Sequence, residues 1–120
     1  MSLPIRNKYG RKKVTDGVRS YDSKLERAVG EMLWLMEKAG EIEDLKFQVE
    51  VRLTRANVLM KPDFSFLENG VRIYLEAKGF PTPVYNLKKR LWKVYGPGEL
   101  RVYGGSYKSF KLIETVYVKP

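Results

Sequence analysis

The stretch from Lys61 to Lys78 constrains the fold of this chain more than any other. It consists of two runs of alternating apolar and polar residues joined by Asn69-Gly70. Asn-Gly between such runs is the strongest local signal for a two-residue β-hairpin, because both positions tolerate a positive φ. We therefore predict a hairpin whose register places Asp63 opposite Glu76.

The two faces of this hairpin differ in character, because side chains alternate between the faces of a strand. The predicted core face carries Phe64, Phe66, Ile73, Leu75 and Ala77. The opposite face carries Asp63, Ser65, Tyr74, Glu76 and Lys78. Cross-strand neighbours have Cβ atoms about 5 Å apart, so the two carboxylates should repel each other. Oxygen ligands that converge in this way are typical of a divalent-cation site, and a solvated polar face screened by Lys78 is the alternative.

The same residues carry a family resemblance. Pro62-Asp63 is followed, after twelve intervening residues, by Glu76-Ala77-Lys78. This pattern resembles the signature of the PD-(D/E)xK nuclease superfamily, which includes many restriction enzymes and phage and archaeal Holliday-junction resolvases. From Asn7 to about Tyr103, the order of the chain resembles small phage-encoded members. The resemblance implies a restriction-endonuclease-like core and a metal-dependent DNA endonuclease whose product carries a 5′ phosphate.

The resemblance also implies roles for particular residues. The implied metal ligands are Asp63, Glu76, Glu26 and the main-chain carbonyl of Ala77. Lys78 would orient the nucleophile and stabilise the developing charge. Gln48 matches a Gln or Glu that small members often carry beside the catalytic Asp, and an ordinary exposed Gln is the alternative.

Composition narrows the chemistry independently. The chain has 23 Lys and Arg against 14 acidic residues, a net charge of +9, which favours nucleic acid as the partner over an anionic membrane surface. It contains no Cys and no His. Disulfides, Cys/His zinc sites, cysteine nucleophiles and Ser-His-Asp triads are thereby excluded. Any metal must be held by oxygen ligands, which favours Mg²⁺ or Mn²⁺.

Length and patterning predict one domain over residues 1–120, with a basic arm at 1–20 and a C-terminal extension at 106–120. The first residues lack the pattern of a signal peptide, and no run approaches membrane-spanning length. We expect a cytoplasmic protein, in the host cytoplasm if it is phage-encoded.

The remaining elements follow from periodicity and from start and stop signals. They are a helix over 24–39 after the Ser23 cap, a strand over 45–53, a helix over 84–95 after Thr82-Pro83, a strand over 100–103 and an edge strand near 115–118. Gly104-Gly105 is interpreted as a break. The hairpin completes an α/β (α+β) fold of order αβββαβ, with a mixed sheet flanked by helices. In the first helix, Glu26 serves the capping box, the metal site or both.

Basic residues in three places are the predicted DNA contacts. They are Lys8, Arg11, Lys12 and Lys13 in the arm, Lys61 in the hairpin, and Lys88, Lys89, Arg90 and Lys93 in the second helix. For the arm, a disordered solubilising terminus is an equal alternative. In the helix, Val84, Leu87, Leu91 and either Val94 or Tyr95 are expected to face the core, which leaves the cations for phosphate groups.

The sequence-based hypothesis is a homodimeric Holliday-junction resolvase acting on branched DNA. Alternatives are another phage endonuclease (flap, nicking or site-specific), a non-catalytic nucleic-acid-binding module on a nuclease-like fold, and a ribosomal or RNA-binding accessory protein. The joint presence of Asp63, Glu76 and Lys78 argues against the last two.

Overall fold

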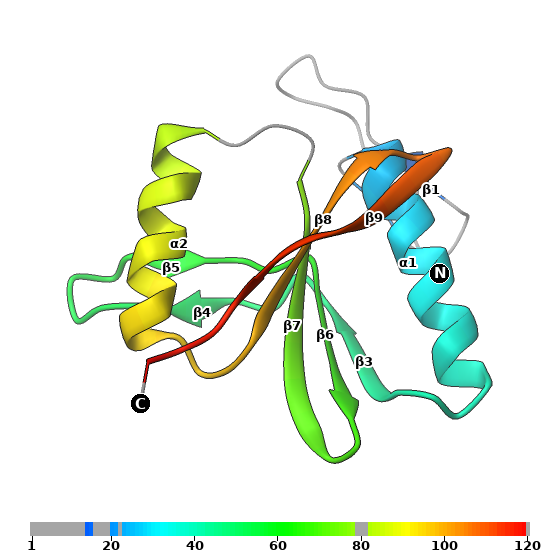
Figure 1. Cartoon of the computed structure of the whole chain (residues 1–120), viewed down its shortest axis with the longest axis horizontal. Coiled ribbons are helices and arrows are strands. Elements are labelled where there is room, and N and C mark those ends of the chain that lie inside the picture. Colours follow the sequence, from blue (N-terminus) through cyan, green and yellow to red (C-terminus); the bar gives the residue numbers. More distant parts are fainter. Residues whose placement is uncertain (1–13, 16–19, 22, 79–81, 120) are drawn as a thin grey trace.

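The structure is a computed structural model that describes residues 14–15, 20–21, 23–78 and 82–119 (Figure 1). Its elements, in chain order, are β1 (Val14–Thr15), β2 (Ser20–Tyr21), α1 (Lys24–Lys38), β3 (Glu43–Phe47), β4 (Val51–Arg52), β5 (Leu59–Met60), β6 (Phe64–Glu68), β7 (Val71–Ala77), α2 (Pro83–Tyr95), β8 (Leu100–Ser106) and β9 (Ser109–Val116).

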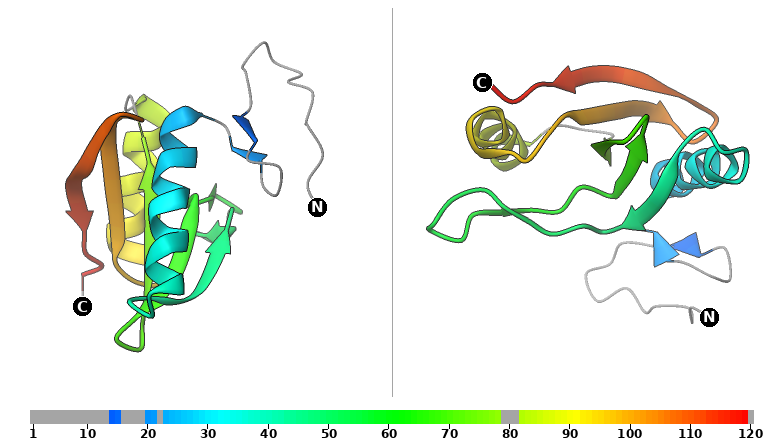
Figure 2. Two further views of the ribbon diagram at one scale, coloured as in Figure 1. Left: turned by 90° about the vertical axis from the view of Figure 1, so that its right-hand side faces the viewer. Right: turned by 90° about the horizontal axis from the view of Figure 1, so that it is seen from below.

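A five-stranded mixed sheet forms the centre of the molecule, with strand order β3-β6-β7-β8-β9. Its neighbours are antiparallel except β7 and β8, which are parallel and joined through α2. Parallel neighbours need such a crossover connection. The two helices lie on opposite sides of the sheet (Figures 1 and 2). The predicted mixed sheet with flanking helices is confirmed.

The predicted hairpin register is also confirmed. Phe64 pairs with Leu75, and Glu68 pairs with Val71 next to the turn. Asn69 and Gly70 have φ values of 52° and 79°, the left-handed conformation that Asn and Gly tolerate best. The first position beyond the paired ladder therefore brings Asp63 beside the end of β7.

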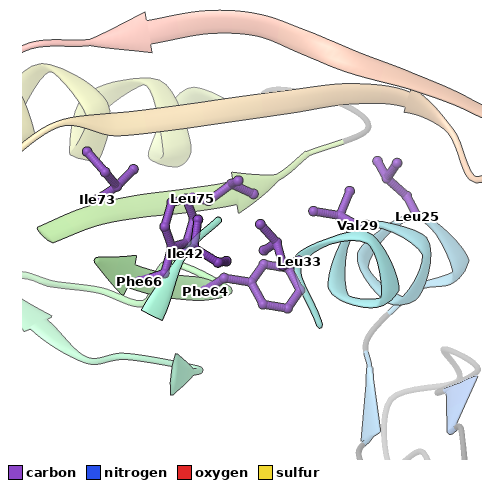
Figure 3. Close-up of a cluster of buried hydrophobic side chains, with 8 residues drawn as sticks. All are labelled: Leu25, Val29, Leu33, Ile42, Phe64, Phe66, Ile73 and Leu75. Atoms are coloured by element: carbon purple, nitrogen blue, oxygen red, sulfur yellow. The ribbon is translucent and has the colours of Figure 1, made fainter. Parts of the chain in front are cut away.

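One face of the sheet packs against α1. Ser23 caps this helix by accepting the N–H of Glu26, and Gly40 follows its end with a φ of 80°. The buried residues of this core are Leu25, Val29, Leu33, Ile42, Phe64, Phe66, Ile73 and Leu75 (Figure 3). The predicted core face of the hairpin is thus the face that α1 covers.

The opposite face of the sheet is covered by α2. Trp92 is fully buried there, makes an edge-on contact with Tyr74 at 5.2 Å between ring centroids, and donates its indole N–H to the Gly98 carbonyl at 2.7 Å. Met60, Leu100, Val102 and Val116 complete this second core. The polar side of the hairpin therefore faces a protein layer, and the alternative of a solvated face is wrong.

The predicted orientation of α2 is wrong except at Leu91, which is half-buried and packs against the second core. Tyr85 and Trp92 are its buried residues, whereas Val84, Leu87 and Val94 are exposed. Both sets have helical spacing, so periodicity alone did not distinguish them. The rings of Tyr85 and Trp92 face the sheet because they fill the space over Tyr74 and β8.

Two strand predictions also need correction. The expected strand over 45–53 ends at Phe47, because Gln48 adopts a φ of 56° and the chain enters the separate β4–β5 ribbon. Gly104-Gly105 lies inside β8, where it pairs with Lys111 and Phe110. The predicted edge position of the last strand is confirmed, but β9 begins at Ser109, so most of the expected extension over 106–120 belongs to the central sheet.

Near the N-terminus, β1 and β2 pair as a short antiparallel ribbon. The predicted DNA contacts of the arm, Lys8, Arg11, Lys12 and Lys13, lie outside the described residues. Neither helix in the described part of the chain has the length and apolar character needed to cross a membrane.

Candidate functional site

Two carboxylates meet where β6 begins and β7 ends. Asp63 directly precedes β6 and is only 7% exposed, and Glu76 is the penultimate residue of β7. Asp63 Oδ2 accepts the backbone N–H of Ala77 at 2.9 Å. This contact extends the hairpin by one side-chain hydrogen bond and fixes the two acids as neighbours.

The electrostatics of Glu76 reflect this closeness. Burial first, and then the negative charge of Asp63 and a hydrogen bond with it, raise the pKa of Glu76 well above its ordinary range. The charge of Lys78 acts in the opposite direction, and that of Glu26 adds to the rise. The two acids therefore share an environment that favours either a proton or a cation between them.

A third acid reaches the same environment from α1. Glu26 is 3% exposed, and its Oε2 accepts a hydrogen bond from Gln48 Nε2 at 3.0 Å. The backbone N–H of Gln48 donates to the Asp63 carbonyl at 2.9 Å. Gln48 thus connects Glu26 to the strand that carries Asp63. Its side chain is exposed overall, but it is bound to another predicted site residue.

The lysine of the signature lies on the same side of the sheet. Lys78 follows β7 and lies within charge range of Glu76. Its Nζ lies 5.0 Å from the centroid of the Tyr85 ring, a cation–π contact. Tyr85 comes from the first turns of α2, so this helix helps to place the ammonium group beside the acids.

A cavity of about 210 Å³ opens beside these groups. Its walls include Lys61 after β5, Glu76 and Lys78 at the end of β7, and Tyr85 and Lys88 from α2. A larger hollow of about 570 Å³ lies between the β4–β5 ribbon and the C-terminal end of α2. We place the candidate site at the smaller cavity, because Glu76 and Lys78 line it.

The predicted DNA-contacting residues of α2 fall into different environments. Lys88 lines the cavity, Arg90 is exposed and Lys93 is half-buried. Lys89 is 20% exposed and forms an ion pair with Glu114 of β9 at 2.7 Å. It joins α2 to the edge of the sheet, and this ion pair offsets part of the charge that was predicted to contact DNA.

The donor set fits a hard divalent cation in its chemistry. Asp63, Glu76 and the Ala77 carbonyl offer oxygen atoms only, as Mg²⁺ and Mn²⁺ prefer. Among the residues that the structure describes, no three acidic side chains are gathered as a preformed metal cluster. The close acidic pair is Asp63 and Glu76, and Glu26 contributes charge to it from α1.

Tyr85 was not among the predicted site residues, yet it lines the cavity. Tyr85 is 8% exposed, and its hydroxyl has no hydrogen-bond partner in the described part of the chain. Burial, followed by the charges of Glu76, Glu114 and Asp63, raises the pKa of Tyr85, so the hydroxyl stays protonated. The available signal was its position three residues before Lys88, on the same helical face.

Together, the fold and this cluster define a mixed α+β domain with an acidic site beside a lysine-lined cavity. The chain belongs to the family described as "Protein of unknown function (DUF1064)", whose model matches residues 6–114. A comparison with curated proteins finds no match.

Proposed function

We propose that this protein is a metal-dependent endonuclease that hydrolyses phosphodiester bonds in DNA, on a restriction-endonuclease-like core. The observation that carries the proposal is the adjacency of Asp63 and Glu76, with Lys78 on the same side of the sheet. Stability alone disfavours a buried carboxylate beside a half-buried one, so the placement of Asp63 and Glu76 is better explained by a cation-dependent activity.

Each residue of the site has a separate proposed role. Asp63, Glu76 and the Ala77 carbonyl would hold Mg²⁺ or Mn²⁺, with Glu26 as a further acid. When bound, the cation supplies Lewis acidity toward the phosphodiester and a more acidic water. Lys78 places a positive charge where negative charge develops on the phosphate. Gln48 orients Glu26 through its amide.

A narrower proposal concerns the substrate. The resemblance to small phage resolvases, together with the net charge of +9, supports branched DNA as substrate and a homodimer as the acting form. Two copies would present two sites to the symmetric strands of a four-way junction. Selectivity for branched DNA requires that the protein hydrolyses DNA. Hydrolysis, in contrast, does not require selectivity for branched DNA.

The test is a cleavage assay on four-way, flap and linear DNA of unrelated sequences, with Mg²⁺ and with EDTA. We expect cleavage that requires the metal and is fastest on the four-way junction. Equal cutting of all three substrates would leave an endonuclease without junction selectivity. Tight DNA binding without cleavage in the presence of any metal would reject the proposed endonuclease activity. It would instead support a non-catalytic nucleic-acid-binding module.

A further inference from the structure

The cavity that contains the candidate site has features that metal-assisted hydrolysis does not require. Three lysines line it from three separate parts of the chain: Lys61 after β5, Lys78 after β7 and Lys88 in α2. Neither Lys78 nor Lys88 forms an ion pair with a residue in the described ranges. Lys61 contacts Glu50 only at 3.8 Å, with both side chains more than half exposed. The cavity wall therefore has three lysines and the one carboxylate of Glu76, with which Lys78 interacts.

The start of α2 adds to this positive character. Thr82 caps the helix by accepting the N–H of Tyr85 at 3.1 Å, and the first turn contains no acidic residue. The helix macrodipole consequently has its positive end at the cavity without a local negative charge to offset it. Thr82 itself lines the cavity wall.

A buried donor at the same wall also indicates a ligand. Tyr85 lines the cavity, is 8% exposed, and has a hydroxyl without a hydrogen-bond partner among the described residues. Leaving such a group unpaired costs free energy. A ligand oxygen, or a water held with the ligand, would provide the missing acceptor.

We propose that this cavity is a phosphate subsite, in which Lys61 and Lys88 bind a backbone phosphate of a nucleic-acid strand. Because Glu76 and Lys78 also line the cavity, a phosphate held there by Lys61 and Lys88 would lie next to the proposed hydrolytic centre. This last point rests on the proposed function, whereas phosphate binding in the cavity does not. The subsite recognises the charge and shape of the backbone, so it predicts little sequence preference.

The experiment uses the full chain in EDTA and measures binding of a short oligothymidine by isothermal titration and by amide chemical shifts. Wild-type shifts should be largest at Lys61, Lys78 and the first two turns of α2, and they should saturate. Lys88→Ala should weaken binding about tenfold, because a hydrogen-bonded charge contact is lost. Tyr85→Phe, which removes only the hydroxyl, should also weaken binding. The matched control is Lys111→Ala, which removes an exposed lysine of β9 outside the cavity.

Several outcomes would overturn the subsite. One is equal weakening by Lys88→Ala and Lys111→Ala, and another is wild-type affinity in Lys88→Ala. A third is saturable binding of inorganic phosphate without binding of the oligonucleotide, which would indicate an adventitious ion only. Thermal unfolding checks that each variant is folded. Absence of cleavage with Mg²⁺ would reject the proposed function and leave phosphate binding intact, so the two failures are distinguishable.

Discussion

The carboxylate of Asp63 accepts the backbone N–H of Ala77 at 2.9 Å, just where the β6–β7 ladder ends. A side chain thus replaces the next backbone acceptor, and Asp63 is held against the residue that follows Glu76. The geometry keeps two carboxylates close even though their charges repel. It also links the hairpin turn, which sets the register, to the chemistry at the opposite end of the strands.

The first prediction concerns this repulsion. Asp63→Asn retains an oxygen that can accept the Ala77 N–H but removes a negative charge beside Glu76. Without metal, the free energy of unfolding should increase by up to about 1 kcal/mol, as expected when like charges on facing strands are relieved. Chemical denaturation in EDTA measures this. Adding Mg²⁺ should stabilise the wild type and leave Asp63→Asn unchanged, and a destabilised variant in EDTA would contradict the account.

The second prediction concerns the bridge from Gln48 to Glu26. Gln48→Asn preserves a residue that tolerates the local φ of 56° but shortens the side chain, so its amide no longer reaches Glu26. Mg²⁺ affinity should fall roughly tenfold, a typical effect of removing a group that orients a metal ligand. Calorimetric titration with Mg²⁺ measures it. An unchanged Mg²⁺ affinity in Gln48→Asn would show that the hydrogen bond from Gln48 to Glu26 does not contribute to metal binding.

The third prediction separates two adjacent lysines. Lys88→Ala should lower the slope of log affinity for DNA against log salt by about one unit, because one phosphate contact is lost. Lys89→Ala should leave that slope unchanged and reduce the free energy of unfolding by roughly 1 kcal/mol, because its partly buried pair with Glu114 is lost. Salt-dependent binding and denaturation curves test both. If Lys89→Ala lowered the salt slope and Lys88→Ala lowered only the free energy of unfolding, Lys89 would be the DNA contact and Lys88 the stabilising residue.

The fourth prediction concerns acid stability far from the site. Arg101 donates hydrogen bonds to both oxygens of Glu68 at 2.7 and 3.3 Å, and these bonds are the main reason why the pKa of Glu68 is lowered from 4.5. A lowered folded-state pKa gives stability that is present above the unfolded-state pKa and lost as the pH falls through the folded-state value.

Glu68→Gln should therefore lower the Tm at neutral pH by an amount corresponding to about 1 kcal/mol. The difference from wild type should shrink as the pH falls below 4.5. Glu31→Gln, which removes an exposed partner of Arg27, serves as the control and should have a smaller effect. A Glu68→Gln difference that does not depend on pH would mean that packing, not charge, explains it.

Local signals predicted the parts of the fold that they determine directly. Asn69-Gly70 fixed the hairpin register, and with it the adjacency of Asp63 and Glu76, because side chains alternate with a period of two. The Ser23 and Thr82 caps likewise fixed the starts of both helices. These features depend on neighbours a few residues apart in the chain.

Features set by tertiary contacts were not predictable in the same way. The alternation from Leu45 to Leu53 does not show that the backbone turns at Gln48, whose conformation is supported by hydrogen bonds to the chain around Asp63. The burial of Tyr85 instead of Val84 depends on the space above the sheet. For the same reason, the cavity and the pairing of Lys89 with Glu114 became evident only in three dimensions.

The most direct test of the central claim is single-turnover cleavage of a four-way DNA junction with Mg²⁺ by wild type, Asp63→Asn and Lys78→Ala. Glu41→Gln, which removes an exposed carboxylate outside the site, is the control. We expect wild type and control to cut at similar rates, and both site variants to be slowed at least about a hundredfold while still binding the junction. Cleavage by Asp63→Asn at the wild-type rate would contradict this expectation.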